Sequence, residues 1–234
     1  MNKEDLFISM DDILKDGIHY PGDNLPIGFN WRLFDSTPGL EGIGTRGRLD
    51  HAFYLYRYAY LLPDSSVIVE IGTSGGASAI AMAMGLGANN NNSSKIYTID
   101  PGFLPAEEIE KRSLYKKYGV QKLDLGKVYE LIKKVGLENY ITIIPDTSEN
   151  VLKTWNGCID MIHIDGSHTY EDVKVDCQWL QYIKKGGVAV FDDWFEPVQR
   201  AAKEYFDTHH EWELLTDSTA QPQRHPWKTV FWKN

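Results

Sequence analysis

A glycine-rich stretch follows a short apolar run in the first third of the chain. Residues 67–69 lead into Glu70, and the spacing Gly-x-x-Gly-Gly then starts at Gly72 and ends where a helical pattern, residues 77–85, begins. Glycines let a backbone turn tightly and approach a ligand, and the N-terminus of the following helix offers free amides to it. Dinucleotide-binding loops have the spacing Gly-x-Gly-x-x-Gly instead. The stretch therefore predicts a cradle for a nucleotide-like cofactor without a pyrophosphate.

Aspartates stand at the ends of two later apolar runs. Asp165 closes the run that starts at residue 159, and the pair Asp192 and Asp193 follows 27 and 28 positions later. The carboxyl ends of parallel strands meet at one edge of a sheet, so these carboxylates should converge. Converging carboxylates repel each other, and a hard cation such as Mg²⁺ relieves the repulsion. The spacing predicts a metal site; the alternative is one capping residue and one substrate hydrogen-bond acceptor in the pair, without metal.

Two more carboxylates end earlier strands. Asp100 follows the run 95–99, where its oxygens can accept the protons of both hydroxyls of a ribose. The alternative for Asp100 is a helix N-cap before Pro101. Asp146 follows the run 140–144, and either it or Ser148 is also able to cap the next helix.

The elements that must position these residues alternate along the chain. Helical patterns separate nearly all of the strand candidates, which are residues 67–71, 95–100, 140–144, 159–165 and 187–191. The last candidate follows an expected turn at 184–187. Such alternation predicts an α/β fold with a doubly wound, mostly parallel sheet. After a helix at 196–210, the runs 212–215 and 228–232 are expected to form an antiparallel C-terminal pair at one edge. The asparagine run 89–92 is expected to be a solvated loop without a role.

Length and charge restrict the class of protein. The chain has 234 residues, 42% of them hydrophobic, which suits one large domain at 49–234 preceded by an N-terminal extension at 1–48. That extension is expected to cap the active site, to contact another copy in a homo-oligomer, or to cover core surface. The net charge of −9 and the absence of a basic cluster argue against nucleic acid as a partner. With no secretory pattern and no membrane-length apolar run, a cytoplasmic protein is expected.

The glycine stretch resembles motif I of the class I S-adenosylmethionine-dependent methyltransferases. In that family, helix-terminal amides and the carboxylate at the strand end hold the amino acid part of the cofactor, and the position of Asp146 lies near the adenine amino group. The resemblance implies a Rossmann-like fold with S-adenosylmethionine as cofactor. The cofactor-binding residues that we expect are Glu70, Gly72, Thr73, Ser74, Gly75, Gly76, Ser78, Asp100, Asp146, Thr147 and Asp165.

The aspartate motifs resemble those of metal-dependent O-methyltransferases of the catechol, caffeoyl coenzyme A and macrolide-sugar types. The runs 159–172 and 186–193 are similar to the family that groups the sugar enzymes with cephalosporin-hydroxylase-like proteins. Catechol and caffeoyl coenzyme A enzymes have Asp-Asn at the Asp192 and Asp193 positions. The sugar enzymes often have a second aspartate where this chain has Ser167 and His168. The lysine base of the catechol enzymes corresponds to His168 here.

The resemblance implies an S-adenosylmethionine-dependent O-methyltransferase that acts on a hydroxyl of a small molecule, with a sugar or glycoside as the expected acceptor. Asp165, Asp192 and Asp193 would hold Mg²⁺, and His168, whose unperturbed pKa is near neutrality, would take the proton. His168 is also able to act as a capping histidine that only orients Asp165. The alternative functions are a nicotinamide-dependent oxidoreductase and a non-catalytic protein that keeps the fold.

Overall fold

The computed structural model describes residues 46–102, 124–216 and 228–234. The predicted extension, 1–48, lies outside these ranges except where the first described helix, α4 (Arg46–Leu61), begins. Its expected role in capping the site or joining two copies therefore concerns residues that are not described. Among the described helices, none is long and apolar enough to cross a membrane.

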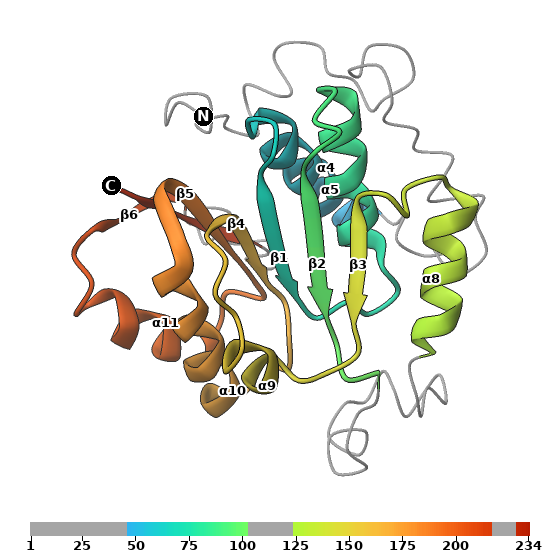
Figure 1. The fold of residues 1–234 in the computed structure, drawn as a ribbon. Helices are drawn as coiled ribbons and strands as arrows, with labels where there is room; N and C mark the ends of the chain where they lie inside the picture. The colour runs from blue at the N-terminus through green and yellow to red at the C-terminus, as the bar shows by residue number, and fades with distance from the viewer. Residues whose placement is uncertain (1–45, 103–123, 217–227) are drawn as a thin grey trace.

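Seven strands form one sheet in the order β3-β2-β1-β4-β5-β7-β6 (Figure 1). The first five strands are parallel, and β7 runs antiparallel to both β5 and β6. The expected doubly wound sheet with an antiparallel C-terminal pair is confirmed. The strand bounds are β1 (Val67–Ile71), β2 (Lys95–Ile99), β3 (Ile141–Ile144), β4 (Ile159–Ile164), β5 (Ile183–Asp192), β6 (Trp212–Thr216) and β7 (Lys228–Lys233).

The strands alternate their side chains between two apolar clusters, one on each face of the sheet. Ile68 on β1 packs with α4 on one face, and its neighbour Val69 packs on the other. The first face is covered by α4, α5 (Ala77–Ala88) and α8 (Leu125–Lys134). The second is covered by α9 (Ser148–Leu152), α10 (Tyr170–Asp176), the 3₁₀ helix Cys177–Tyr182 and α11 (Val198–Phe206). The sheet is thus the middle of three layers.

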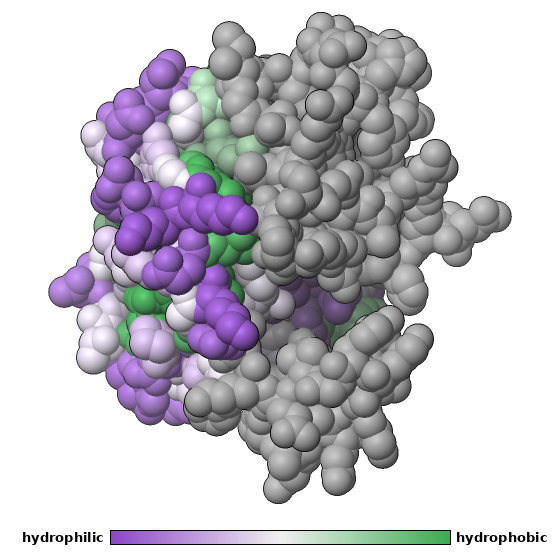
Figure 2. All heavy atoms as spheres, turned by 90° about the vertical axis from the view of Figure 1, so that its right-hand side faces the viewer, coloured by the Kyte–Doolittle hydropathy of each residue, from purple (hydrophilic) through white to green (hydrophobic). Residues whose placement is uncertain are grey.

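Helix α8 shows how an outer layer meets both core and solvent. Its buried side chains are Val128, Leu131 and Ile132, and Asp124 caps its N-terminus through the amides of Gly126 and Lys127. Figure 2 views the molecule from the side where α8 lies and shows hydrophilic residues over much of the described surface. The helix is amphipathic, and it covers the edge of the sheet formed by β3.

Two local predictions need correction. Strand β5 begins at Ile183, earlier than the expected residue 187. Residues 184–187 of the expected turn lie at a register shift relative to β4, with Gly186 at φ +78°. The asparagine run is structural: Asn91 is buried, and its amide donates a hydrogen bond of 2.5 Å to the Leu62 carbonyl. Asn89 donates similarly to the Tyr60 carbonyl at 2.7 Å. These bonds attach the end of α5 to the end of α4.

Candidate active site

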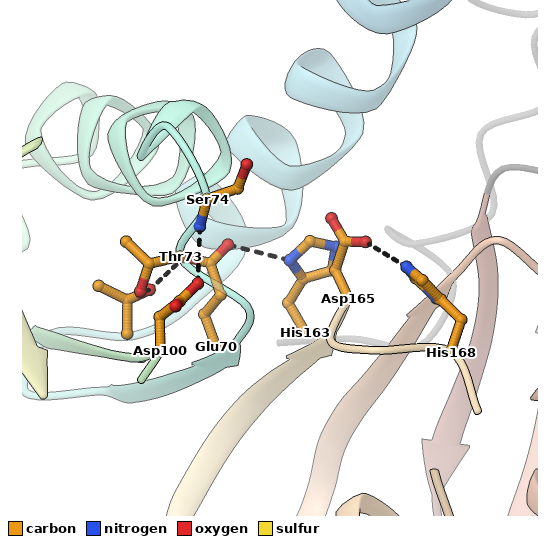
Figure 3. Close-up of polar contacts among 8 residues, drawn as sticks. Glu70, Thr73, Ser74, Asp100, His163, Asp165 and His168 are labelled. Carbon is orange, nitrogen blue, oxygen red and sulfur yellow. Dashed lines mark hydrogen bonds and ion pairs between the residues drawn. The ribbon is translucent and has the colours of Figure 1, made fainter. Parts of the chain in front are cut away.

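The turn after β1 is held against the turn after β4 by a glycine. Gly72 has φ +98°, and a Cβ atom on it would lie 2.1 Å from the backbone carbonyl oxygen of Asp165. The Asp165 amide also donates a hydrogen bond of 2.9 Å to the Ile71 carbonyl. The glycine loop, residues 72–76, and Asp165 are therefore neighbours (Figure 3).

The glycine loop ends at the N-terminus of α5. Gly76 precedes the helix with φ +82°, and Ser74 is also left-handed, with φ 45°. A non-glycine residue in this conformation is strained, and such strain occurs often at functional sites. Gly76 supplies no side-chain cap to α5, so the amides of the first turn, where Ser78 stands, are available to a polar ligand. Gly75, Gly76 and Ser78 thus lie where a cofactor site is expected.

Asp100 holds the glycine loop from the side of β2. One carboxylate oxygen accepts a hydrogen bond of 3.1 Å from the Ser74 amide, and the other accepts one of 2.8 Å from the Gly102 amide. Asp100 is therefore beside the loop, and it also stabilises the local turn at Gly102. The alternative, a helix N-cap, depends on residues beyond 102 that lie outside the described ranges. Contact with a ribose stays a prediction.

Glu70 lies beneath the glycine loop, at the end of β1. Its side chain is fully buried; one oxygen accepts a hydrogen bond of 2.7 Å from Thr98 Oγ1, and the other lies 3.1 Å from His163 Nδ1. A buried carboxylate needs such partners. In this structure both Glu70 oxygens are engaged by neighbouring strands, and its contact with the cofactor stays a prediction. His163, which we predict to be a core histidine, is buried as expected.

Three ionisable side chains, those of Asp165, His168 and Asp193, converge beyond the ends of β4 and β5. His168 Nε2 lies 3.5 Å from Asp165 Oδ1 and 3.7 Å from Asp193 Oδ2, and all three side chains are partly exposed. His168 and Asp193 have φ 57° and 47°. Holding a non-glycine residue in this region costs on the order of 1–3 kcal/mol, which the surrounding structure must offset. The expected meeting of Asp165 with Asp193 is observed, and His168 lies between them.

Asp192 is the third predicted metal ligand. It is 8% exposed at the end of β5, where the backbone pairs with Lys228 of β7. Across the described ranges, no three His, Cys, Asp or Glu side chains are grouped so that they could hold a metal ion. Two of the three predicted metal ligands, Asp165 and Asp193, meet at His168, and a metal role for Asp192 stays a prediction.

The loop that carries His168 is fixed by Asp172, which the sequence analysis did not single out. Thr169 is the N-cap of α10, and its hydroxyl accepts a hydrogen bond from the Asp172 amide. Asp172 Oδ2 accepts hydrogen bonds from the hydroxyls of both Ser167 and Thr169, the residues on either side of His168. The spacing Thr-x-x-Asp is close to a capping box, and this pattern could have revealed the role.

The loop after β3 carries the other predicted cofactor residues. Thr147 is the N-cap of α9, and Asp146 Oδ1 accepts hydrogen bonds from the Thr147 amide and the Asn150 side chain. The hydrogen bond from Asn150 lowers the pKa of Asp146, with a smaller contribution from Thr147. Asp146 also lines a groove of about 560 Å³ along Tyr97 and Trp155. Thr147, rather than Asp146 or Ser148, is thus the cap of α9, and contact of Asp146 with adenine stays a prediction.

Asp176 joins the loop after β3 to α10 from below. Its carboxylate accepts a hydrogen bond of 2.5 Å from the Ser148 hydroxyl, which also accepts from Trp179 Nε1 at 3.0 Å. Asp176 stands on the apolar face of its helix, with Val173 and Cys177. A carboxylate on such a face is the sequence signal for a buried polar contact. Burial raises the pKa of Asp176 to about 7, although the bond from Ser148 acts in the opposite direction.

This pKa predicts how stability depends on pH. Between pH 4 and 7 the folded chain binds a proton at Asp176 that the unfolded chain has lost, so the free energy of unfolding falls as pH rises. From pH 5 to 8 we expect this contribution to fall by about 2–3 kcal/mol. Urea denaturation of wild type and Asp176→Asn at both pH values measures it: the decrease should be smaller in the variant. Parallel pH profiles would contradict the assignment.

Comparisons with known proteins agree with this arrangement. Residues 69–194 match the family model described as a methyltransferase domain. The O-methyltransferase NovP is similar in structure, with 18% identity, a TM-score of 0.62, and 83% of this chain and 81% of that chain covered. An O-methyltransferase from Bacillus cereus in complex with S-adenosylhomocysteine is similar as well, with 13% identity and a TM-score of 0.61. The match covers 95% of this chain and 96% of that chain.

An rRNA methylase from Streptococcus thermophilus is also similar, with 18% identity, a TM-score of 0.54, and 81% and 98% of the two chains covered. No curated protein matches the sequence significantly. At these identities the structural likeness establishes the fold. It leaves the methyl acceptor open, because proteins with different acceptors share it.

Proposed function

The chain belongs to the methyltransferase domain family, and from that premise we propose that it transfers the methyl group of S-adenosylmethionine to a hydroxyl of a small molecule, with a sugar or glycoside as the acceptor class. The observation that carries the proposal is the packing of Gly72 against the Asp165 backbone. It places the loop expected to bind the cofactor beside the side chains expected to do the chemistry.

The reaction is an in-line displacement at one carbon. The acceptor oxygen forms a bond to the methyl carbon, the bond from carbon to the sulfonium sulfur breaks, and its electron pair stays on sulfur as a neutral thioether. His168 takes the hydroxyl proton, and the positive charge that it acquires lies beside Asp165 and Asp193. Because two bound reactants are joined, much of the acceleration comes from positioning.

The proposal includes a Mg²⁺ ion held by Asp165 and Asp193. Asp165 and Asp193 offer hard oxygen donors that face one point, since both lie within 3.7 Å of the same imidazole nitrogen. Mg²⁺ commonly binds one or two carboxylates and keeps several waters, so this pair suits it. When bound, the ion would lower the pKa of the attacking hydroxyl.

The metal requirement predicts a reversible loss of activity. In the presence of a chelator we expect methyl transfer to fall by at least about tenfold, because the hydroxyl then keeps its ordinary pKa. Added Mg²⁺ should restore the rate in wild type and not in Asp193→Asn. The measurement is the rate of S-adenosylhomocysteine formation. An unchanged rate in chelator would contradict the metal part while leaving methyl transfer intact.

The acceptor class is tested with methyl-labelled S-adenosylmethionine. The label should appear on an oxygen of one or more sugars or glycosides in a panel that also contains phenols and a ribosomal RNA fragment. The net charge of −9 supports a small molecule over RNA, because a polyphosphate would be repelled. Label on RNA alone, or on no hydroxyl compound, would contradict the proposal.

A further inference from the structure

Four buried polar residues lie in or directly under the glycine loop: Glu70, Thr73, Thr98 and His163. We propose that Glu70 is a positioning residue that holds the glycine loop in its cofactor-binding shape through the hydroxyls of Thr98 and Thr73. The inference rests on the proposed function, and it assigns Glu70 a role that needs no contact with the cofactor.

The four residues form one continuous chain of hydrogen bonds. Thr98 Oγ1 donates to Glu70 Oε2 at 2.7 Å, and it lies 2.7 Å from Thr73 Oγ1. A hydroxyl has a single proton, so Thr98 must accept from Thr73 when it donates to Glu70. His163 Nδ1 contacts the other carboxylate oxygen at 3.1 Å. The orientation of every hydroxyl in the chain is thereby set by the carboxylate.

Register explains why these side chains meet. Glu70 on β1 pairs with Thr98 on β2 and with His163 on β4, so the three form a row across neighbouring strands. Each precedes an isoleucine that ends its strand. Because alternate residues share a face, the row points to the face covered by α4 and α5.

The row ends in the loop that must hold the cofactor. The Thr73 side chain is 1% exposed, and its carbonyl accepts a hydrogen bond of 2.8 Å from the Gly76 amide, which closes the turn before α5. Ser74, the next residue, has its strained φ of 45°. A fixed Thr73 hydroxyl therefore helps to hold a turn that would otherwise relax. His163 extends the same network to the strand that ends beside Asp165 (Figure 3).

The test compares two substitutions of Thr98. Thr98→Val keeps the shape of the side chain and removes its hydroxyl, whereas Thr98→Ser keeps the hydroxyl. We expect Thr98→Val to weaken S-adenosylhomocysteine binding by about tenfold, measured by calorimetry, because the Thr73 and Glu70 groups lose their partner. Thr98→Ser should bind within about twofold of wild type. The control is Ser94→Ala, which removes an equally buried hydroxyl, bonded to the Ser66 amide, at the opposite end of β2.

The outcomes separate the two proposals. Wild type that fails to bind S-adenosylhomocysteine contradicts the proposed function. If wild type binds S-adenosylhomocysteine and Thr98→Val binds it equally well, the positioning role of Glu70 is overturned. Equal weakening in Thr98→Val and Ser94→Ala also overturns it, because general loss of stability then explains the effect. If Thr98→Val does not fold, Thr73→Val and Thr73→Ser decide by the same comparison.

Discussion

Replacing His168 with glutamine is expected to lower the rate of methyl transfer by about 100- to 10,000-fold, the usual contribution of a general base. Glutamine keeps a polar group beside Asp165 and Asp193 but cannot take a proton. The dissociation constant for S-adenosylhomocysteine should change little, because His168 is not part of the glycine loop. The measurements are the rate of methyl transfer as a function of pH and calorimetric binding.

The pH profile distinguishes a base from a capping residue. Loss of a base should flatten the rise of rate with pH, whereas loss of a cap would lower the rate equally at every pH. His210→Gln is the control, since His210 is exposed and follows α11 without any predicted chemistry. A variant of His168 with the wild-type profile would show that the histidine only orients its neighbours.

Replacing Gly72 with alanine is expected to destabilise the fold by about 3 kcal/mol or more and to abolish cofactor binding in what remains folded. The new Cβ would lie 2.1 Å from the Asp165 carbonyl oxygen, so the two loops would have to separate. The left-handed φ adds roughly 1–2 kcal/mol of strain. Urea denaturation at neutral pH measures the total.

Gly136→Ala separates these two causes. Gly136 also has a left-handed φ, +73°, but a Cβ there would meet nothing within 4 Å. That variant should therefore show the strain alone, about 1 kcal/mol. If Gly72→Ala were no less stable than Gly136→Ala, the close approach of the two loops would not be a feature of the protein in solution.

The fold could be predicted from the sequence because its signals are local and repeated. Apolar runs that alternate with helical patterns require a parallel sheet, and two final runs without an intervening helix require an antiparallel pair. The start of β5 was missed because glycine and lysine indicate a turn by composition. Ile183 pairs with Ile159 of β4, and residues 184–187 lie at the register shift that follows. The role of Asn91 depends on Leu62, which no local pattern indicates.

The site was predicted where strand ends determine it and missed where orientation does. Asp165 and Asp193 meet because their strands are neighbours. Glu70 stands at the end of a strand, where a side chain can point up to a ligand or down into the sheet. Its cross-strand partners decide between these, and Thr98 and His163 give it two partners below the loop.

Binding of S-adenosylhomocysteine to the wild-type chain tests the central claim most directly. Calorimetric titration, with a nicotinamide dinucleotide titrated in parallel, compares the predicted cofactor class with the one that the loop spacing excludes. We predict saturable binding of one S-adenosylhomocysteine per chain and no binding of the dinucleotide. No heat of binding for S-adenosylhomocysteine up to millimolar concentration, or preference for the dinucleotide, would contradict the account.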